Sequence, residues 1–375
     1  MVFIIGGTLA FFFEFLLLSK KNKSLPDKLL AVWMFILGLH LFLFYFTYTG
    51  LDFKYTILLA IDMPFPFLHG PMLFLYTASI TGRLKNWKML HLLHFLPFLF
   101  FYIYYAPFFI MTPHDKIAFV NKFISGYQDI YTKFSYPAML ISAITYLVLT
   151  FFMIRRHQRD IRDFYSYSSE KINLHWLRNL LIGMAVVWIV VIVANAWVRD
   201  IRSDVAIYVT VVLFVISMGY FGIRQGNIFV TPLHIQTGQK NDITEASNTK
   251  RYIKSGLKES DAKEIQNKLV TMMEGEKVFL DEELSLTKLS DQIGVLPNYL
   301  SQVINERFEK NFYDFVNAYR IEEFKKLALD TRNKNKTLLA LAMDSGFASK
   351  ASFNNSFKRY TGQTPTEYLS AFQKS

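Results

Sequence analysis

The side chains best suited to chemistry lie on two segments near the C-terminal end of the chain. Each segment follows one plan, in which a short amphipathic helix, a glycine turn and a second helix succeed one another. With the apolar stripes assigned to a core, the second helices present amides, hydroxyls and basic groups outward. Asn and Gln can form paired hydrogen bonds with adenine, and Lys suits guanine or phosphate. The residues predicted to contact DNA are Asn298, Ser301, Gln302, Asn305, Lys350, Ala351, Asn355, Lys358 and Arg359.

The first segment, residues 285–306, contains clear signals for two helices. Ser285 precedes LTKLSDQI, Gly294 supplies the turn, and Pro297 opens PNYLSQVINERF at a position where proline is favoured. The apolar side chains recur at helical spacing, which predicts that they face a common core. These core residues are Leu286, Leu289 and Ile293 on the first helix and Leu300, Val303 and Ile304 on the second.

The second segment, residues 337–360, repeats this plan with TLLALAMDS, a turn at Gly346 and a helix capped by Ser349. Phe353 and Phe357 are four residues apart and are predicted to face inward. The helix NFYDFVNAYRIEEFKKLALD is expected to join the two segments. Any single outward residue could be part of a solvated helix face. Two turn-linked pairs together favour helix-turn-helix units, whose second helices read the major groove.

The stretch GFASKASFNNSFKRYTGQTPTEY resembles the signature of the AraC/XylS family of transcription regulators, and the resemblance extends over the last hundred or so residues. NYLSQVINE and FVNAYRIEEFKKL resemble the first unit and linker helix of that family. Leu296 stands where a capping Ser or Thr is usual, and Ser290 stands where Ala is usual. The resemblance implies sequence-specific DNA binding and control of transcription. The signature positions are Gly346, Phe347, Ser349, Phe353, Phe357, Lys358, Gly362, Thr364, Pro365 and Tyr368.

The chain before about residue 223 has a different composition. Hydrophobic residues make up 52% of the whole sequence, which includes 37 Phe, and they gather in apolar blocks. A helix needs roughly 20 apolar residues to cross a bilayer. We therefore predict an all-α protein, in which a bundle of seven transmembrane helices precedes a soluble, all-helical AraC-type double helix-turn-helix domain. The predicted spans are 2–18, 29–49, 57–80, 89–111, 134–154, 180–198 and 205–223.

The distribution of charge predicts how these spans are oriented. Lys and Arg are more numerous after the first, third and fifth blocks than in the other loops. Because the basic loops of membrane proteins stay in the cytoplasm, the N-terminus is predicted to lie outside and the C-terminal domain inside. This places the protein in a bacterial inner membrane. The net charge of +11 is not by itself evidence for DNA binding, because most of it lies between the apolar blocks.

Polar residues inside the apolar blocks are the candidates for a membrane site. Glu14, Asp62, His69, His91 and His94 are predicted to form a polar pocket for a ligand or a proton. The alternative is that they only bridge helices or lie near the membrane surface. His91 and His94 are spaced for one helix face, but no third ligand is evident beside them, so no metal site is predicted. The absence of Cys excludes disulfides, thiolate metal sites and a Cys nucleophile.

The predicted domains are 1–223, a transmembrane sensor or anchor; 224–259, a flexible cytoplasmic linker; and 260–375, the DNA-binding domain. Ser260 is expected to cap the first helix of that domain. The membrane half with its junction, including LHGPMLFLYTASI, LLHFLPF and RYIKSGL, resembles multi-pass regulators of Bacteroidetes-type bacteria, which implies a sensor.

The function predicted from these features is a one-component transcription regulator rather than an enzyme, with no catalytic residue and no cofactor. Its expected partners are double-stranded DNA, membrane lipid, RNA polymerase, and a small-molecule or envelope signal; a homodimer is also compatible with the sequence. A membrane transporter or enzyme with a regulatory DNA-binding tail is the alternative. Transporters often contain internal repeats and paired intramembrane charges, and neither is evident in this sequence.

Overall fold

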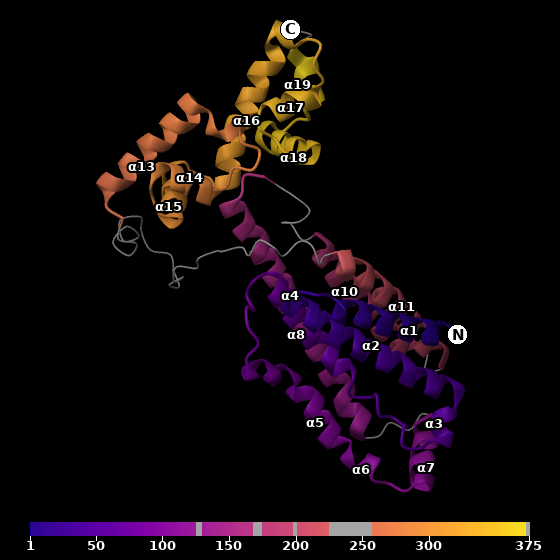
Figure 1. The fold of residues 1–375 in the computed structure, drawn as a ribbon. Coiled ribbons are helices and arrows are strands. Elements are labelled where there is room, and N and C mark those ends of the chain that lie inside the picture. Colours follow the sequence, from indigo (N-terminus) through magenta and orange to yellow (C-terminus); the bar gives the residue numbers. More distant parts are fainter. Residues whose placement is uncertain (125–129, 168–174, 198–200, 225–256, 373–375) are drawn as a thin grey trace. The chain divides into compact units, whose positions relative to one another are not determined.

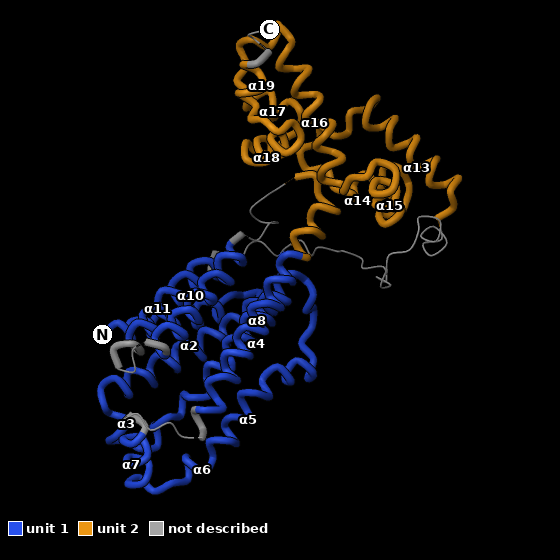
Figure 2. The backbone as a smooth tube through the Cα atoms, turned by 180° about the vertical axis from the view of Figure 1, so that it is seen from behind, with its two compact units in different colours: residues 1–155, 174–233 blue, residues 156–173, 234–375 orange. Residues whose placement is uncertain are grey.

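The computed structural model describes residues 1–124, 130–167, 175–197, 201–224 and 257–372 of the chain. Within these residues every regular element is a helix (Figure 1). The chain divides into two units, which Figure 2 distinguishes by colour. Unit 1 comprises residues 1–155 and 174–233, and unit 2 comprises residues 156–173 and 234–375. Almost all of the predicted linker, 224–259, falls outside the described residues.

Five long helices form most of unit 1. They are α1 (Val2–Leu18), α2 (Leu25–Thr49), α8 (Ile130–Phe164), α10 (His175–Trp197) and α11 (Ile201–Arg224), the last turns of α8 belonging to unit 2. Four of them contain stretches long and apolar enough to cross a membrane: Leu25–Thr49, Lys133–Phe164, Trp176–Asn195 and Val205–Gly222. The first block forms the apolar helix α1, which at 17 residues is shorter.

The structure differs from the prediction of single spans over the blocks 57–80 and 89–111. The first block contains turns up to Phe65, and its helix α4 runs only over Pro66–Ile80. Pro66 explains why α4 begins there. Proline has no N–H to donate within a helix, but the first turn of a helix needs no such donor. The second block is divided among short helices, and seven unbroken spans therefore remain a proposal. The short elements are α3 (Leu51–Lys54), η1 (Met89–Phe95), α5 (Leu96–Tyr104), α6 (Ala106–Phe109) and α7 (Pro113–Ile124).

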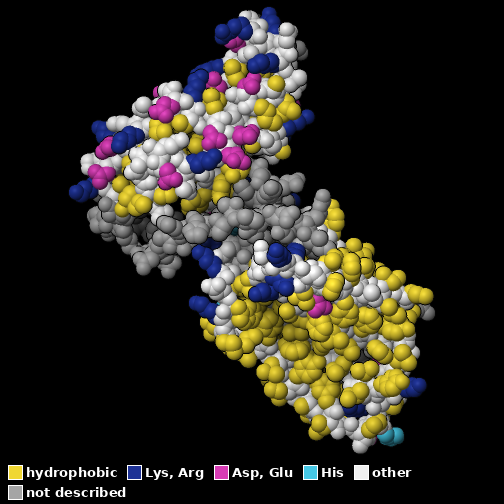
Figure 3. Space-filling view, in the orientation of Figure 1, with side chains coloured by type: hydrophobic (Ala, Val, Ile, Leu, Met, Phe, Trp, Pro, Cys, Tyr) yellow, Lys and Arg dark blue, Asp and Glu magenta, His cyan; other side chains and the backbone are white. Residues whose placement is uncertain are grey.

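The apolar side chains of unit 1 face both inward and outward. Inside, α1 packs closely on α2, since a Cβ at Gly7 would lie only 2.7 Å from the ring of Phe42. Outside, Ile103 is 66% exposed, and Phe152 and Leu213 are each 63% exposed. Figure 3 shows apolar side chains covering the visible face of this unit. Monomeric soluble proteins rarely expose so much contiguous apolar surface, which is typical of a membrane or protein interaction site.

Unit 2 has two hydrophobic cores that share the helix α16 (Phe312–Leu329). Phe312 and Phe315, near its start, belong to the first core, and Ile321 and Phe324 belong to the second. The other helices of the first core are α13 (Glu259–Thr271), the π turn η3 (Met272–Glu276), η4 (Val278–Leu280), α14 (Leu286–Ile293) and α15 (Pro297–Arg307). The helices that follow α16 in the chain are η5 (Thr331–Asn333), α17 (Leu338–Asp344), α18 (Lys350–Thr361) and α19 (Pro365–Phe372).

The start of α13 corrects one prediction from the sequence. The residue that precedes this helix is Lys258, and no side chain caps it. Ser260 lies within the first turn, where its hydroxyl donates to the carboxylate of Asp261 over 2.9 Å. The predicted cap at Ser260 is therefore wrong.

Candidate DNA-binding surface

The helix pair α14–α15 forms as its sequence predicts. The Ser285 hydroxyl accepts a hydrogen bond from the Lys288 N–H over 3.2 Å and so caps α14. Gly294 ends that helix with a φ of 79°, a left-handed conformation that glycine adopts without strain. Pro297 occupies the first turn of α15. The residues predicted to face the core are buried: Leu286, Leu289, Ile293, Leu300, Val303 and Ile304.

The predicted DNA-contacting residues of α15 lie on the side opposite this core. Asn298 and Asn305 are exposed, whereas Ser301 and Gln302 are half-buried. The Asn305 amide donates to the Ser301 carbonyl over 2.8 Å, and the Gln302 amide donates to the Glu306 carboxylate over 3.2 Å. The amide N–H groups of Asn305 and Gln302 therefore already have partners on α15, which a base edge would have to replace.

The second pair, α17–α18, turns at Gly346 against the first core. Gly346 has a φ of 89°, and a Cβ there would lie 2.5 Å from the Phe279 carbonyl oxygen and 2.8 Å from the Leu280 Cα. Only glycine fits this position. Beyond the turn, the Ser349 hydroxyl accepts from the Ser352 N–H over 3.2 Å and caps α18, as predicted.

A buried aromatic cluster determines which side of α18 faces outward. The Phe353 ring centroid lies 4.5 Å from that of Phe324 on α16, and the Phe357 centroid lies 5.5 Å from it. Both phenylalanines are buried, as predicted. The predicted DNA-contacting residues of this helix are all exposed: Lys350, Ala351, Asn355, Lys358 and Arg359.

Two features of α18 were not predicted from the sequence. Asn354 is exposed beside Asn355, so it also belongs to the candidate surface, and the doubled Asn in FNNSF was its only sequence signal. Arg359 donates to the Asp314 carboxylate of α16 over 2.7 Å. To bind a DNA phosphate, Arg359 must therefore either leave Asp314 or contact the phosphate and Asp314 at the same time.

A hydroxyl contact also connects α16 with α18. The Tyr313 hydroxyl lies 2.9 Å from the Ser356 hydroxyl and 3.4 Å from that of Ser352. Both serines are buried on the inner side of α18. The joining helix therefore contacts the second reading helix through polar groups as well as through Phe324.

In unit 1, two of the five predicted pocket residues, His69 and Asp62, are connected through His40. His69 Nε2 lies 3.2 Å from His40 Nδ1, and the Trp33 indole donates to His69 Nδ1 over 3.4 Å. His40 Nε2 lies 3.0 Å from the Tyr208 hydroxyl and 3.8 Å from the Asp62 carboxylate. These contacts form a buried polar chain between α2, α4, α11 and the loop that holds Asp62.

The other three predicted pocket residues make different contacts. His94 Nδ1 lies 2.9 Å from the Tyr146 hydroxyl, and His91 Nδ1 accepts from the Lys88 N–H over 3.0 Å. Among the described residues, Glu14 shares no polar contact with any of the histidines. The five residues therefore do not share one set of contacts.

Comparisons with known proteins match the C-terminal part of the chain. Residues 289–371 match the family described as Helix-turn-helix domain. An uncharacterized HTH-type transcriptional regulator of Staphylococcus aureus (strain COL) is 39% identical over 87 residues, covering 23% of this chain and 11% of that protein. The melibiose operon regulatory protein of Escherichia coli (strain K12) is 24% identical over 94 residues, covering 25% of this chain and 30% of that protein. A solved structure of a protein of unknown function from Listeria innocua is 30% identical, covers 28% of this chain and 92% of that chain, and has a TM-score of 0.24.

The C-terminal part of the chain therefore carries a helix-turn-helix domain of a DNA-binding type. That domain is of the AraC type, and its relatives are transcription regulators. The chain spans 11% of the length of the Staphylococcus relatives that match it first, so the likeness concerns this domain alone.

Proposed function

We propose that the chain is a membrane-bound, one-component transcription regulator that binds DNA sequence-specifically through α14–α15 and α17–α18. In this proposal α15 and α18 lie in the major groove, with their exposed amide and lysine side chains toward the DNA. The observation that carries it is the same division of both helices into a buried apolar face and an exposed polar face. Asn298 and Asn355 are the exposed amides that we assign to base edges.

The membrane part of the proposal is supported by the apolar surface of unit 1 and by its four membrane-length helices. We place this unit in a bacterial inner membrane, with the N-terminus outside and unit 2 in the cytoplasm. The basic loops favour this orientation, and DNA binding requires it. Unit 1 then holds the regulator at the membrane and senses a signal there.

Mapping of DNA contacts in cells tests the DNA-binding part. The full chain, with an epitope tag, is cross-linked to DNA and recovered from the membrane fraction. We expect a defined set of genomic sites for the unaltered chain and loss of these sites for Asn298→Ala/Asn355→Ala. Asn267→Ala, which removes an exposed amide from α13, is the matched control and should retain the sites. Recovery without any enriched site would refute the proposal.

Deletion distinguishes sensing from anchoring. A chain that keeps unit 2 alone, with residues 156–173 joined to 234–375, is compared with the full chain for expression of the mapped target genes under varied envelope and nutrient conditions. A sensor loses its response to conditions when unit 1 is removed. If the truncated regulator still responds to the same conditions, unit 1 is only an anchor.

A further inference from the structure

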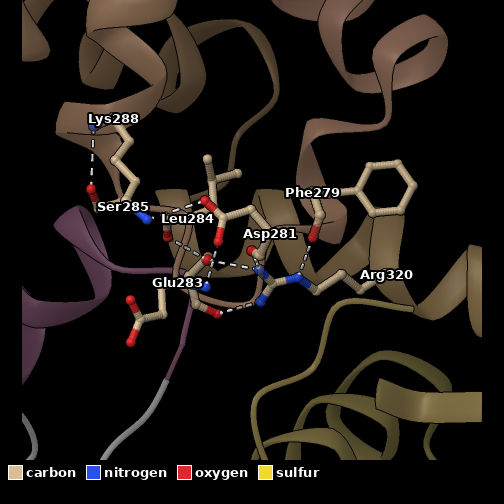
Figure 4. Close-up of polar contacts among 8 residues, drawn as sticks. Phe279, Asp281, Glu283, Leu284, Ser285, Lys288 and Arg320 are labelled. Carbon is tan, nitrogen blue, oxygen red and sulfur yellow. Dashed lines mark hydrogen bonds and ion pairs between the residues drawn. The ribbon is translucent and has the colours of Figure 1, made fainter. Parts of the chain in front are cut away.

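Arg320 is a buried cation in the middle of α16 with 0% of its surface exposed. Its Nε donates to the Phe279 carbonyl over 2.8 Å, and its Nη2 donates to the Asp281 carbonyl over 2.7 Å (Figure 4). Burial lowers its pKa to about 10, so the guanidinium remains charged at neutral pH. A buried guanidinium is tolerated only when its remaining N–H groups also find acceptors.

Ser166 supplies these acceptors. Arg320 Nη1 donates to the Ser166 carbonyl, and Nη2 donates to the Ser166 hydroxyl, each over 3.1 Å. The Asn317 amide donates to the same carbonyl over 2.9 Å. The Ser166 hydroxyl in turn donates to the Leu284 carbonyl over 2.6 Å. Ser166 is fully buried by these contacts, and its carbonyl oxygen has two donors.

The neighbours of Ser166 extend this contact. Tyr165 forms an antiparallel bridge with Ser285, the residue that caps α14. Phe164 packs against the first core of unit 2. We call residues 164–166 the strap. The socket that receives it consists of Arg320, Asn317 and the segment 279–285.

The strap follows the charged end of a helix that contains a candidate membrane span. Phe164 is the last residue of α8, and the charged segment 155–163 separates it from the apolar part of that helix. The part of α8 up to Arg155 belongs to unit 1, whereas the strap belongs to unit 2. The chain therefore passes between the two units within α8, and again after residues 173 and 233.

The socket lies where the two helix pairs are held together. Ser285 caps α14, while Asn317 lies one turn after Tyr313, whose hydroxyl contacts Ser352 and Ser356 of α18. The Asn317 amide also donates to the Tyr313 carbonyl over 2.8 Å. An occupied socket thus braces α14 and α16, which position α15 and α18.

We propose that the strap is a coupling element, which docks in the socket and holds the two helix pairs in the arrangement that binds DNA. A movement of α8 would then withdraw the strap and weaken DNA binding. The docking of the strap is inferred from its hydrogen bonds with Arg320, Asn317 and the segment 279–285. Its effect on DNA binding rests on the proposed function. The two parts are therefore tested separately.

Disulfide trapping in the full chain tests the docking. The natural sequence has no Cys, so a disulfide can form only between introduced residues. Tyr165→Cys and Ser285→Cys occupy bridge positions, where Cα atoms lie about 4.5–5.5 Å apart, within the range for a disulfide. A protease site inserted after Gln239 separates the chain into two fragments, which only the disulfide can keep together. The control pairs Tyr165→Cys with Thr331→Cys, an exposed position after α16.

After oxidation in membranes and cleavage, we expect joined fragments for the 165–285 pair and separate fragments for the control pair. Separate fragments for the 165–285 pair, or equal joining of both pairs, would overturn the docking. This outcome does not depend on whether the chain binds DNA, so it is distinct from a failure of the proposed function.

A substitution in the strap tests its effect on DNA binding. Ser166→Arg places a second cation against Arg320 in a fully buried position and should expel the strap. Tyr167→Arg adds the same charge at the next, half-buried residue and is the control. Coupling between sites typically amounts to 5–150-fold in affinity. We expect Ser166→Arg to weaken DNA binding by the full chain in lipid nanodiscs at least fivefold relative to Tyr167→Arg. Equal or tighter binding by Ser166→Arg would overturn the bracing role.

Discussion

Asn355 and Lys358 lie one turn apart on the exposed side of α18, and their chemistry assigns them different tasks. An amide can distinguish base edges, whereas an ammonium holds any phosphate. We expect Asn355→Ala to weaken binding to the preferred DNA by roughly 1–3 kcal/mol and to relax preference at one position. Lys358→Ala should weaken all sequences alike and reduce the slope of log affinity against log salt by about one unit.

Binding of the full chain in nanodiscs to a randomised DNA library at two salt concentrations measures both effects. Asn267→Ala on α13 is the control for loss of an exposed amide. An Asn355→Ala chain that loses affinity equally for every sequence would show that Asn355 does not read a base.

Phe357 is the residue on which the orientation of α18 most depends. It is fully buried, and its ring centroid lies 5.5 Å from that of Phe324 and 5.4 Å from that of Tyr368. Truncating a buried Phe to Ala typically destabilises a protein by about 3–5 kcal/mol. We expect Phe357→Ala to lower the melting temperature of unit 2 in the full chain strongly, and Tyr360→Ala, at a residue that is 46% exposed, to lower it far less. Similar melting temperatures for the Phe357→Ala and Tyr360→Ala variants would mean that the buried and exposed sides of α18 are wrongly assigned.

The sequence predicted these residues because local periodicity determines them. Phe353 and Phe357 are four residues apart, so one helix face must hold both. The same reasoning could not find Ser166, whose hydrogen bonds to Arg320 join residues 154 positions apart. Nor could it find the ion pair of Arg359 with Asp314, which depends on how α18 packs on α16.

At the level of elements, α15 lacks a feature that the other reading helix has. Leu296 precedes α15, makes no side-chain cap and is 60% exposed, whereas Ser349 caps α18. A Ser at such a position typically contributes about 0.5–2 kcal/mol. We expect Leu296→Ser to raise the free energy of unfolding of unit 2 in the full chain by about that amount, and Ser349→Ala to lower it similarly. Urea unfolding measures both, and a destabilised Leu296→Ser variant would contradict the description of this helix end.

The prediction of helices from sequence succeeded where turn residues and helical periodicity agreed, and it failed in the proline-containing apolar blocks 57–80 and 89–111. α14, α15, α16 and α18 lie where the sequence placed them. Hydropathy alone could not show that the block 57–80 becomes helical only at Pro66, because turns and helices can be equally apolar. The polar chain from Trp33 to Asp62 was likewise hidden, since it depends on the packing of α2 against α4 and α11.

At the level of the whole molecule, the orientation in the membrane remains a prediction from the basic loops. Reporter fusions after Lys122 and after Gln239 test it. We expect the first reporter to be outside the cytoplasm and the second to be inside, because three predicted spans, an odd number, separate the two sites and the basic loops place the C-terminal side in the cytoplasm. A cytoplasmic reporter after Lys122, or an external reporter after Gln239, would refute the seven-span topology.

The central claim is that a chain held in a membrane reads DNA with two helices on one joining helix. Selection of sequences from a randomised duplex library by the full chain in lipid nanodiscs tests this claim most directly. Two reading helices on a common scaffold should contact successive major-groove segments, which lie about one helical turn, or roughly 34 Å, apart. We predict that the selected DNA contains two short preferred stretches at that spacing. Selected DNA with no preferred sequence, or with a single preferred stretch, would contradict the account.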